Sequence, residues 1–293
     1  MAELLYGKEI AEKIKNSLKQ QITNLKDKYD CVPALCAVQV GENPASSVYL
    51  KAQQKNADNL GINYKLHTLD AGIDEKKLID FILNLNADDK VNGIILQLPL
   101  PAPLDAKKII SFFDPIKDVE GMHPENLGKI ILDKAHLAPC TACAAIEILN
   151  STGIDFYGKE AVVVGHSEIV GKPLALMLLN KFATTTVCHI ATGERGLLQK
   201  HVETAEILIV AVGKANLISG SWVRQGAIVV DIGINRLGDK LVGDVEFDGA
   251  QKKAAYITPV PGGVGPVTVA ILMRNLVEAT KLQLFKRDGK RKR

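Results

Sequence analysis

Short apolar runs, each long enough for one buried strand, recur along the chain and alternate with segments of helical period. Runs of this kind are typical of strands that are covered on both faces. Strands that alternate with helices form βαβ units around a mostly parallel sheet. The sequence therefore predicts an α/β fold with two such series. The predicted strands are Pro33–Val40, Ile62–Leu69, Asn92–Leu98, Ala161–Gly165, Thr184–His189, Ile207–Val212 and Ala227–Ile232.

The predicted helices follow from apolar spacing and from residues that can cap a helix. Asp74 and Thr141 precede apolar stretches, where their side-chain oxygens can accept hydrogen bonds from the first free backbone N–H groups. The stretch from Pro99 to Pro139 is rich in proline and turn residues, so we expect a loop there. Helices are predicted at residues 7–28, 44–60, 74–85, 141–149 and 266–284.

Length and charge narrow the class of protein. A chain of 293 residues allows two domains, or one large domain with a well-buried core. The net charge of +3 is misleading, because residues 286–293 contain six bases and one acid. The rest of the chain is close to neutral, so nucleic-acid binding is not expected, and the tail is expected to be a disordered end.

Targeting and metal signals are not recognised in the sequence. No apolar run reaches the roughly 20 residues that a membrane span needs, and the N-terminus does not resemble a signal peptide. The cytoplasm is therefore the expected location. The five cysteines favour free thiols. Cys140 and Cys143 form a C-x-x-C pair without partners at zinc spacing, so no metal site is predicted.

The segment Gly165–Gly171 follows a predicted strand and opens a helix. Small residues there let the backbone approach a pyrophosphate, and the helix N-terminus favours its negative charge. The spacing differs from G-x-G-x-x-G, and an ordinary strand–helix turn is the alternative. The next strand ends at His189 without the acid that usually binds the adenosine ribose of NAD. His166 or Arg195 could face a 2′-phosphate instead, or both could be ordinary surface residues.

The segment Tyr256–Thr268 contains three prolines and three glycines. It cannot form a helix interior or a central strand, because proline lacks an N–H group and glycine favours irregular backbone. Close approach of the main chain to a flat ligand is the functional interpretation. A rigid connector between domains is the structural alternative.

Motifs spread over nearly the whole chain point to one family. They are Gly41–Ser47, Gly93–Pro101, Lys117–Gly121, Pro139–Thr141 and the Tyr256–Thr268 loop. In these segments the chain resembles the bifunctional methylenetetrahydrofolate dehydrogenase/methenyltetrahydrofolate cyclohydrolases. That family oxidises 5,10-methylenetetrahydrofolate by hydride transfer to NAD(P), and then hydrolyses the methenyl product to 10-formyltetrahydrofolate.

The resemblance also implies a domain plan. A folate domain covers residues 1–138 and is rejoined by residues 267–285, and a Rossmann NAD(P)-binding domain covers residues 139–266. Residues 286–293 form the basic tail. The family's folate lies in the cleft between the domains, and the protein is expected to be a homodimer. NADP is the first expectation for the cofactor, with NAD as the alternative.

Site residues are carried over by position. The implied cofactor contacts are Thr141, Gly165, His166, Ser167, Ile190, Val212, Gly213 and Ile234. The implied folate contacts are Tyr49, Gln97, Leu98, Glu120, Pro261, Gly262 and Gly263.

The expected catalytic set is Tyr49, Gln53, Gln97 and Glu120, and it departs from the family at two positions. Gln53 stands where the family has a lysine, four residues after Tyr49 on the same helix face. Glu120 replaces an aspartate. Glutamine carries no charge, so the dehydrogenase is expected to survive and the cyclohydrolase to be weak or absent. The alternative is a fully bifunctional enzyme in which another group supports hydrolysis.

Two other classes of protein fit parts of the sequence. A shikimate- or amino-acid-type dehydrogenase would share the architecture but not the folate motifs. A catalytically inactive nucleotide-sensing or RNA-associated protein would use the basic tail.

Overall fold

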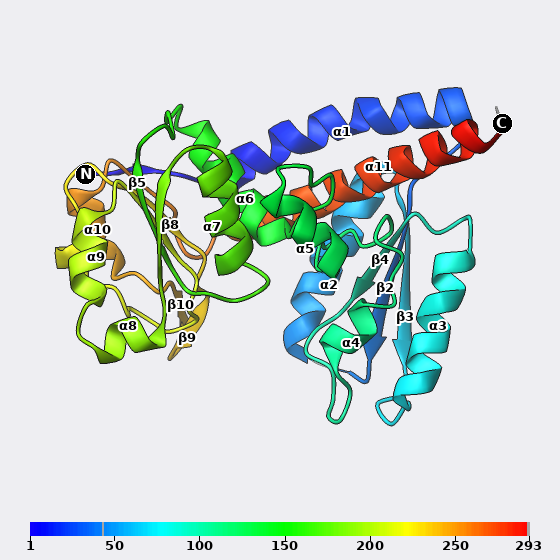
Figure 1. Ribbon diagram of the computed structural model, residues 1–293, viewed down its shortest axis with the longest axis horizontal. Coiled ribbons are helices and arrows are strands. Elements are labelled where there is room, and N and C mark those ends of the chain that lie inside the picture. The colour runs from blue at the N-terminus through cyan, green and yellow to red at the C-terminus, as the bar shows by residue number, and fades with distance from the viewer. Residues whose placement is uncertain (43, 292–293) are drawn as a thin grey trace. The chain divides into compact units, whose positions relative to one another are not determined.

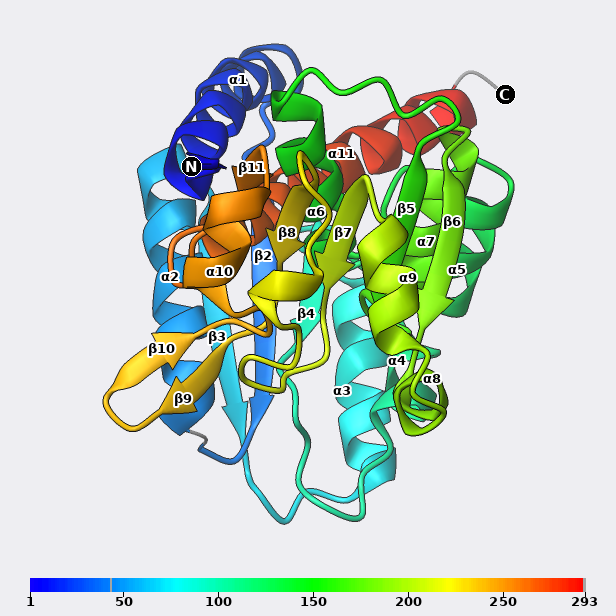
Figure 2. The same ribbon diagram turned by 90° about the vertical axis from the view of Figure 1, so that its left-hand side faces the viewer.

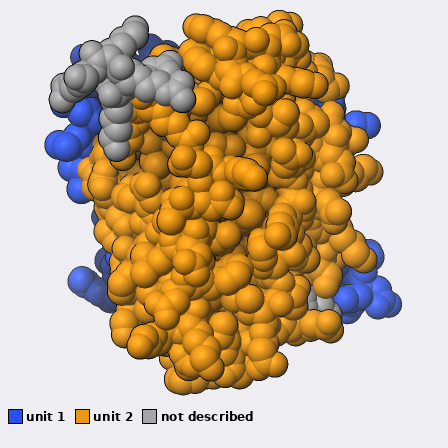
Figure 3. Space-filling model, turned by 90° about the vertical axis from the view of Figure 1, so that its right-hand side faces the viewer, with its two compact units in different colours: residues 1–12, 130–134, 139–271 blue, residues 13–129, 135–138, 272–293 orange. Residues whose placement is uncertain are grey.

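The computed structural model describes residues 1–42 and 44–291, with side chains given outside 44–46 and 288–291. Asn43 in the Gly41–Ser47 motif and the last two residues of the tail lie outside the described part. The chain forms two compact units, coloured separately in Figure 3. Unit 1 comprises Met1–Glu12, Ile130–Lys134 and Pro139–Ile271; unit 2 comprises Lys13–Lys129, Ala135–Ala138 and Leu272–Arg293.

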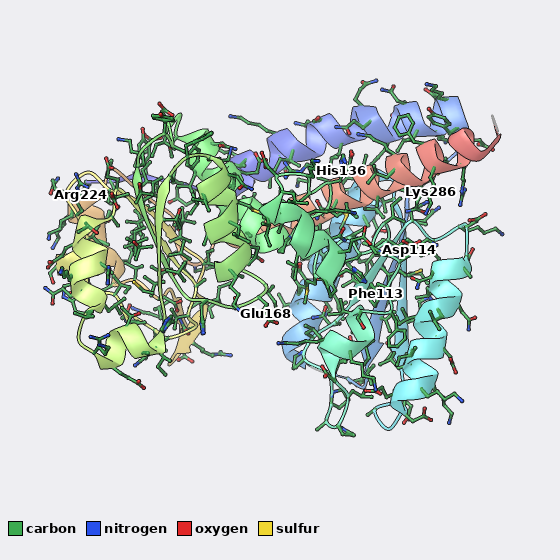
Figure 4. The ribbon with its side chains drawn as sticks, viewed as in Figure 1. Phe113, Asp114, His136, Glu168, Arg224 and Lys286 are labelled. Atoms are coloured by element: carbon green, nitrogen blue, oxygen red, sulfur yellow. The ribbon has the colours of Figure 1, made fainter. Side chains whose placement is uncertain are left out.

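Unit 2 is built on a three-stranded parallel sheet of order β3-β2-β4 (Figure 1). Its strands are β2 (Ala34–Val40), β3 (Asn63–Leu69) and β4 (Gly93–Leu96), and its helices include α2 (Pro44–Leu60), α3 (Glu75–Ala87) and α4 (Ala106–Ile110). The segment after Asp114, a residue labelled in Figure 4, runs beside β4, where Asp118 forms a parallel bridge with Ile94. The C-terminal ends of β4 and of this segment therefore lie at the same edge.

Apolar periodicity explains how this sheet is covered. Leu78, Ile82 and Leu85 of α3 are buried, and they pack with β2 and β4 in one core. The Asp74 carboxylate accepts a hydrogen bond from the Lys77 N–H at 2.8 Å, which confirms the predicted helix cap.

The larger parts of the long helices α1 (Gly7–Tyr29) and α11 (Val264–Arg291) belong to unit 2, where they lie side by side (Figure 1). Lys281 Nζ of α11 donates to Gln21 Oε1 of α1 at 2.7 Å. Asn275 Nδ2 donates to the carbonyls of Val119 and Ala138 at 2.9 and 3.0 Å. The C-terminal helix thus holds the segment that leads into Glu120.

Unit 1 contains a six-stranded parallel sheet of order β1-β11-β8-β7-β5-β6, as Figure 2 shows for its central strands. The chain passes from β5 to β6 on one side and returns to β7 on the other. Ligands of open parallel sheets bind at such a reversal, beyond the carboxyl ends of the strands. The strands are β1 (Glu3–Leu4), β5 (Glu160–Val164), β6 (Thr184–Cys188), β7 (Ile207–Val210), β8 (Ile228–Asp231) and β11 (Tyr256–Ile257).

Helices and one hairpin complete the fold. The helices are α5 (Pro124–Ile131), α6 (Cys140–Ser151), α7 (Gly171–Asn180), α8 (Ile190–Glu194), α9 (Leu198–Thr204), α10 (Phe247–Lys253) and the 3-10 turn η1 (Gly220–Trp222). The antiparallel hairpin consists of β9 (Asn235–Leu237) and β10 (Lys240–Val242). Within the described residues, none of the helices combines the length and apolar character that crossing a bilayer requires.

Several details differ from the sequence predictions. Thr141 is not a cap, because α6 already begins at Cys140 and the Pro139 carbonyl accepts from the Cys143 N–H at 2.9 Å. The expected loop 99–139 contains α4 and α5. The tail, expected to be disordered from residue 286, continues α11 as far as Arg291. Residues 1–12 belong to unit 1, where β1 pairs with β11.

Candidate functional site

The turn after β5 brings backbone close to backbone. Gly165 has φ 120°, and a Cβ atom there would lie 2.3 Å from the Ala211 carbonyl oxygen. A Cβ on Gly171 would lie 2.1 Å from the Gly165 oxygen. Ser167 Oγ accepts from the Val170 N–H at 3.1 Å and so orders the turn before α7. Such a turn can present backbone N–H groups to a phosphate, as the sequence predicted.

We expect Gly165→Ala to abolish detectable nucleotide binding, because the new methyl group displaces the turn and glycine alone tolerates this φ. Gly158→Ala is the matched control: Gly158 also has a positive φ of 70°, yet among the described residues other than its two chain neighbours no heavy atom lies within 4 Å of a Cβ placed there. The measurement is the rise in melting temperature on addition of NAD or NADP. A full ligand-induced rise in the Gly165→Ala variant contradicts this role of the turn.

Beyond the carboxyl ends of β5, β6 and β7 lies a cavity of about 720 Å³. It gathers three of the predicted cofactor contacts: Gly165, Ile190 and Val212. Thr141, His166, Ser167, Gly213 and Ile234 are not among its lining residues, although the His166 and His189 rings lie 5.2 Å apart at its edge. The lining residues that were not predicted from the sequence are His189, Gly193, Glu194, Gly196, Leu198, Gln199, Lys214, Leu217 and Trp222, together with Val164.

Two buried aspartates, also missed, shape the loop after β7. The Asp244 carboxylate accepts from the N–H groups of Val212, Gly213 and Lys214 at 2.6, 2.9 and 2.8 Å. Asp231 accepts from the Gly233, Asp244 and Val245 N–H groups, while burial raises its pKa to about 6. Gly213 and Ile234, predicted to lie near the nicotinamide, therefore stand in two loops that these carboxylates tie together; Ile234 is exposed.

In unit 2 three of the predicted folate contacts, Gln97, Leu98 and Glu120, follow β4 and the segment bridged to it by Asp118. Gln97 follows β4, and its N–H donates to the Val38 carbonyl at 2.8 Å. Its side-chain nitrogen donates to the Leu98 carbonyl at 3.1 Å. Gln97 Oε1 is buried and has no hydrogen-bond partner within residues 1–42 and 44–291. This acceptor is therefore buried with its hydrogen-bonding capacity unused.

Gln53 lies on α2, on the same face as the half-buried Tyr49. Its side chain is fully buried, and its Oε1 accepts from Tyr64 Oη at 3.3 Å. Burial raises the pKa of Tyr64 to about 12, so the phenol remains a donor near neutral pH. In the described part of the chain, Gln53 Nε2 has no hydrogen-bond partner. The lysine position of the family thus holds a neutral, buried hydrogen-bond donor.

Glu120 is half-buried beside the buried Asp118. Burial, with the Asp118 charge as the smaller cause, raises the pKa of Glu120 from 4.5 to about 8. This carboxyl group therefore exchanges its proton near physiological pH, as a general acid or base must.

The loop Pro261–Gly263 belongs to unit 1, where it follows β11. The Gly262 carbonyl accepts from the Gly7 N–H at 2.9 Å, and a Cβ on Gly7 would lie 1.8 Å from the Gly263 oxygen. Tyr256 and Ile257, which the sequence analysis placed in an irregular loop, form β11 instead. The loop Pro261–Gly263 therefore packs against the start of α1.

Comparison with known proteins identifies the family. The model of the tetrahydrofolate dehydrogenase/cyclohydrolase catalytic domain matches residues 5–120, and the model of that family's NAD(P)-binding domain matches residues 139–284. The chain belongs to this family. The resemblance seen in the sequence motifs is thereby confirmed, as is the two-domain α/β fold with a Rossmann-type NAD(P)-binding domain.

Relatives match the chain over nearly its full length. "Bifunctional protein FolD" of a Nitratiruptor species is 45% identical over 279 residues, covering 95% of this chain and 98% of its own. The bifunctional FolD enzyme of Campylobacter jejuni has a TM-score of 0.92 at 43% identity, covering 96% of this chain and 99% of its own. The Trypanosoma brucei enzyme, solved with NADP and an inhibitor, has a TM-score of 0.92 at 34% identity, with coverages of 97% and 98%.

Shikimate dehydrogenases, the alternative considered from the sequence, resemble this chain in fold alone. The enzyme of Thermus thermophilus has a TM-score of 0.52 at 15% identity over 85% of this chain. The chain is an oxidoreductase of the tetrahydrofolate dehydrogenase/cyclohydrolase family. Shikimate dehydrogenases share its architecture.

Proposed function

We propose that this chain oxidises 5,10-methylenetetrahydrofolate to 5,10-methenyltetrahydrofolate. The carbon–hydrogen bond of the bridging methylene group breaks, and its hydride passes to the nicotinamide, which the bound dinucleotide supplies as acceptor. A folate nitrogen lone pair stabilises the cation that remains, so the protein's main task is orientation. The observation that carries the proposal is the glycine turn beside the cavity in the NAD(P)-binding domain.

The folate contacts proposed for this reaction are Tyr49, Gln97, Leu98 and Glu120, with the loop Pro261–Gly263. The acceptor Gln97 Oε1 and the donor Gln53 Nε2 are buried without hydrogen-bond partners in the described part of the chain, and we assign them to complementary polar groups of a pterin ring. The contacts proposed for the dinucleotide are Thr141, Gly165, His166, Ser167, Ile190, Val212, Gly213 and Ile234. The NADP complex of the Trypanosoma brucei relative supports NADP as an acceptor here as well.

Substrate labelled with deuterium at the bridging methylene tests the reaction directly. The reduced dinucleotide is expected to contain deuterium in proportion to the methenyl product formed. A folded protein that reduces neither NAD nor NADP, or that forms unlabelled reduced cofactor, contradicts the proposal.

We further propose that the chain also hydrolyses the methenyl product. The relatives that carry the name bifunctional support this alternative better than the weak or absent hydrolysis expected from Gln53. Hydrolysis needs a water molecule activated beside the methenyl carbon, and Gln53 cannot exchange a proton near neutrality. Glu120, with a pKa of about 8, is the group we assign to that task.

Gln53→Lys is expected to accelerate methenyl hydrolysis by about tenfold or more, because an ionisable amine then joins Glu120. Gln54→Lys is the matched control, since it adds the same charge one residue away on the exposed side of α2. Hydrolysis is measured with methenyltetrahydrofolate supplied directly. An unchanged rate in a folded Gln53→Lys variant contradicts any role for a cation at this position.

We also propose that the protein is a homodimer and that it is located in the cytoplasm. The dimer rests on family resemblance, and sedimentation of the purified chain tests it. A single species of monomer mass at micromolar concentration contradicts it.

A further inference from the structure

One wall of the nucleotide cavity is formed by the single helical turn α8. Ile190 and Glu194 are four residues apart, so they share a face of that turn, and both line the cavity. The turn is fixed at both ends: the His189 N–H donates to Thr192 Oγ1 at 3.2 Å, and the Leu197 N–H donates to the Thr192 carbonyl at 3.1 Å. The two lining side chains therefore come from an ordered element.

The charges around the cavity are unevenly placed. Lys214 follows β7, where its N–H donates to Asp244 Oδ1 at 2.8 Å. Glu194 follows β6, on the other side of β5 in the sheet order. Arg195, the next residue, does not line the cavity. Across residues 1–42 and 44–291, the Glu194 carboxylate forms no ion pair or hydrogen bond, so its charge is available to a ligand.

The end of β6 is where a dinucleotide-binding domain reads the adenosine ribose. An acid there accepts a hydrogen bond from the 2′-hydroxyl of NAD, whereas an arginine accommodates the 2′-phosphate of NADP. Here β6 ends at Cys188 and is followed by His189, without an acid. Ile190, 76% exposed, offers apolar surface to this part of the cavity.

We infer that Glu194 takes over the role of the missing strand-end acid and makes NAD the preferred cofactor. Its carboxylate accepts from the ribose 2′-hydroxyl and repels a 2′-phosphate, while Ile190 gives that phosphate no polar partner. The inference rests on the proposed function for its choice of ligand. It reverses the order of NADP and NAD expected from the family resemblance.

Binding of NAD and NADP can be followed without folate. Trp222 is the chain's single tryptophan and lines the same cavity, so its fluorescence reports nucleotide binding. The wild-type protein is expected to bind NAD at least tenfold more tightly than NADP. In Glu194→Gln, NAD binding weakens and NADP binding strengthens, so that this ratio falls by about tenfold to a hundredfold.

Glu9→Gln, an exposed acid of unit 1 on α1, is the matched control and leaves the ratio unchanged. Tighter binding of NADP than NAD by the wild type, or an unaltered ratio in Glu194→Gln, overturns the inference. Failure of the proposed reaction is distinguishable from this result. If the protein binds NAD selectively but does not reduce NAD when methylenetetrahydrofolate is added, the inference about Glu194 stands and the proposed reaction is contradicted.

Discussion

Glu120→Gln is expected to slow methenyl hydrolysis by about a hundredfold or more, while hydride transfer falls by much less. Glutamine has nearly the same shape as glutamate but cannot accept a proton from water. Oxidation depends on orientation, which a neutral amide at residue 120 can largely maintain. The two steps are measured separately, as hydrolysis of added methenyltetrahydrofolate and as formation of reduced cofactor.

The control for this variant is Glu125→Gln, which removes an exposed carboxylate of α5 that pairs with Lys129. Both activities should remain close to wild type. Equal losses of oxidation and hydrolysis in Glu120→Gln would show that Glu120 only binds the folate, and an unchanged hydrolysis rate would remove it from the reaction.

The same carboxyl group predicts a pH dependence of stability. Its folded pKa of about 8 lies above the ordinary value of 4.5, so between these values the folded state retains a proton that the unfolded state releases. The free energy of unfolding therefore falls as pH rises through this window, by up to about 1.4 kcal/mol per pH unit, and levels off above it. In Glu120→Gln the free energy of unfolding lacks this part of its pH dependence. Hydrolysis that requires the carboxylate rises with pH to a plateau above about 8.

Lys117→Met is expected to lower the free energy of unfolding by about 3 kcal/mol or more. The Lys117 side chain is buried, and its Nζ donates to the carbonyls of Leu85, Asn86 and Asp88 at 3.1, 2.7 and 2.8 Å. These carbonyls belong to the C-terminal end of α3, where a cation is favourable. Methionine retains the apolar stem and leaves three acceptors without this donor.

Denaturant unfolding measures this effect, with Lys90→Met as the control at an exposed lysine of the same unit. The control should change the stability by less than about 0.5 kcal/mol. A similarly small change in Lys117→Met contradicts the structural role of this lysine. Burial lowers the pKa of Lys117, and the Asp114, Asp88 and Asp89 charges oppose this effect to a smaller extent.

The sequence predicted the elements whose signals are local and periodic. The strands and the Asp74 cap were found because a few neighbouring residues determine them. The prediction that all these strands are covered on both faces was wrong for β3 and β6, which lie at sheet edges and are largely exposed or half-buried. The two-residue strands β1 and β11 were missed, because each is too short to show a period and depends on pairing between distant parts of the chain. The hairpin β9–β10 had an available signal, the turn residues Gly238 and Asp239 between apolar positions.

The site shows the same limit. Gly165 could be predicted because its backbone constraint lies in a short motif. Asp244 could not, because it acts on three N–H groups about 30 residues earlier in the chain. Glu194 was missed for a different reason: the ribose-binding acid was sought at the end of the strand, whereas the helical turn α8 places Glu194 five residues beyond His189.

The central claim is that one chain oxidises methylenetetrahydrofolate and hydrolyses the product without the family lysine. A time course with 5,10-methylenetetrahydrofolate and excess NAD, repeated with NADP, tests it when reduced cofactor, methenyl- and 10-formyltetrahydrofolate are quantified together. The account predicts that reduced cofactor rises, faster with NAD at subsaturating cofactor, and that 10-formyltetrahydrofolate forms well above the uncatalysed rate. Accumulation of methenyltetrahydrofolate, with 10-formyl product appearing only at the uncatalysed rate, would contradict the claim.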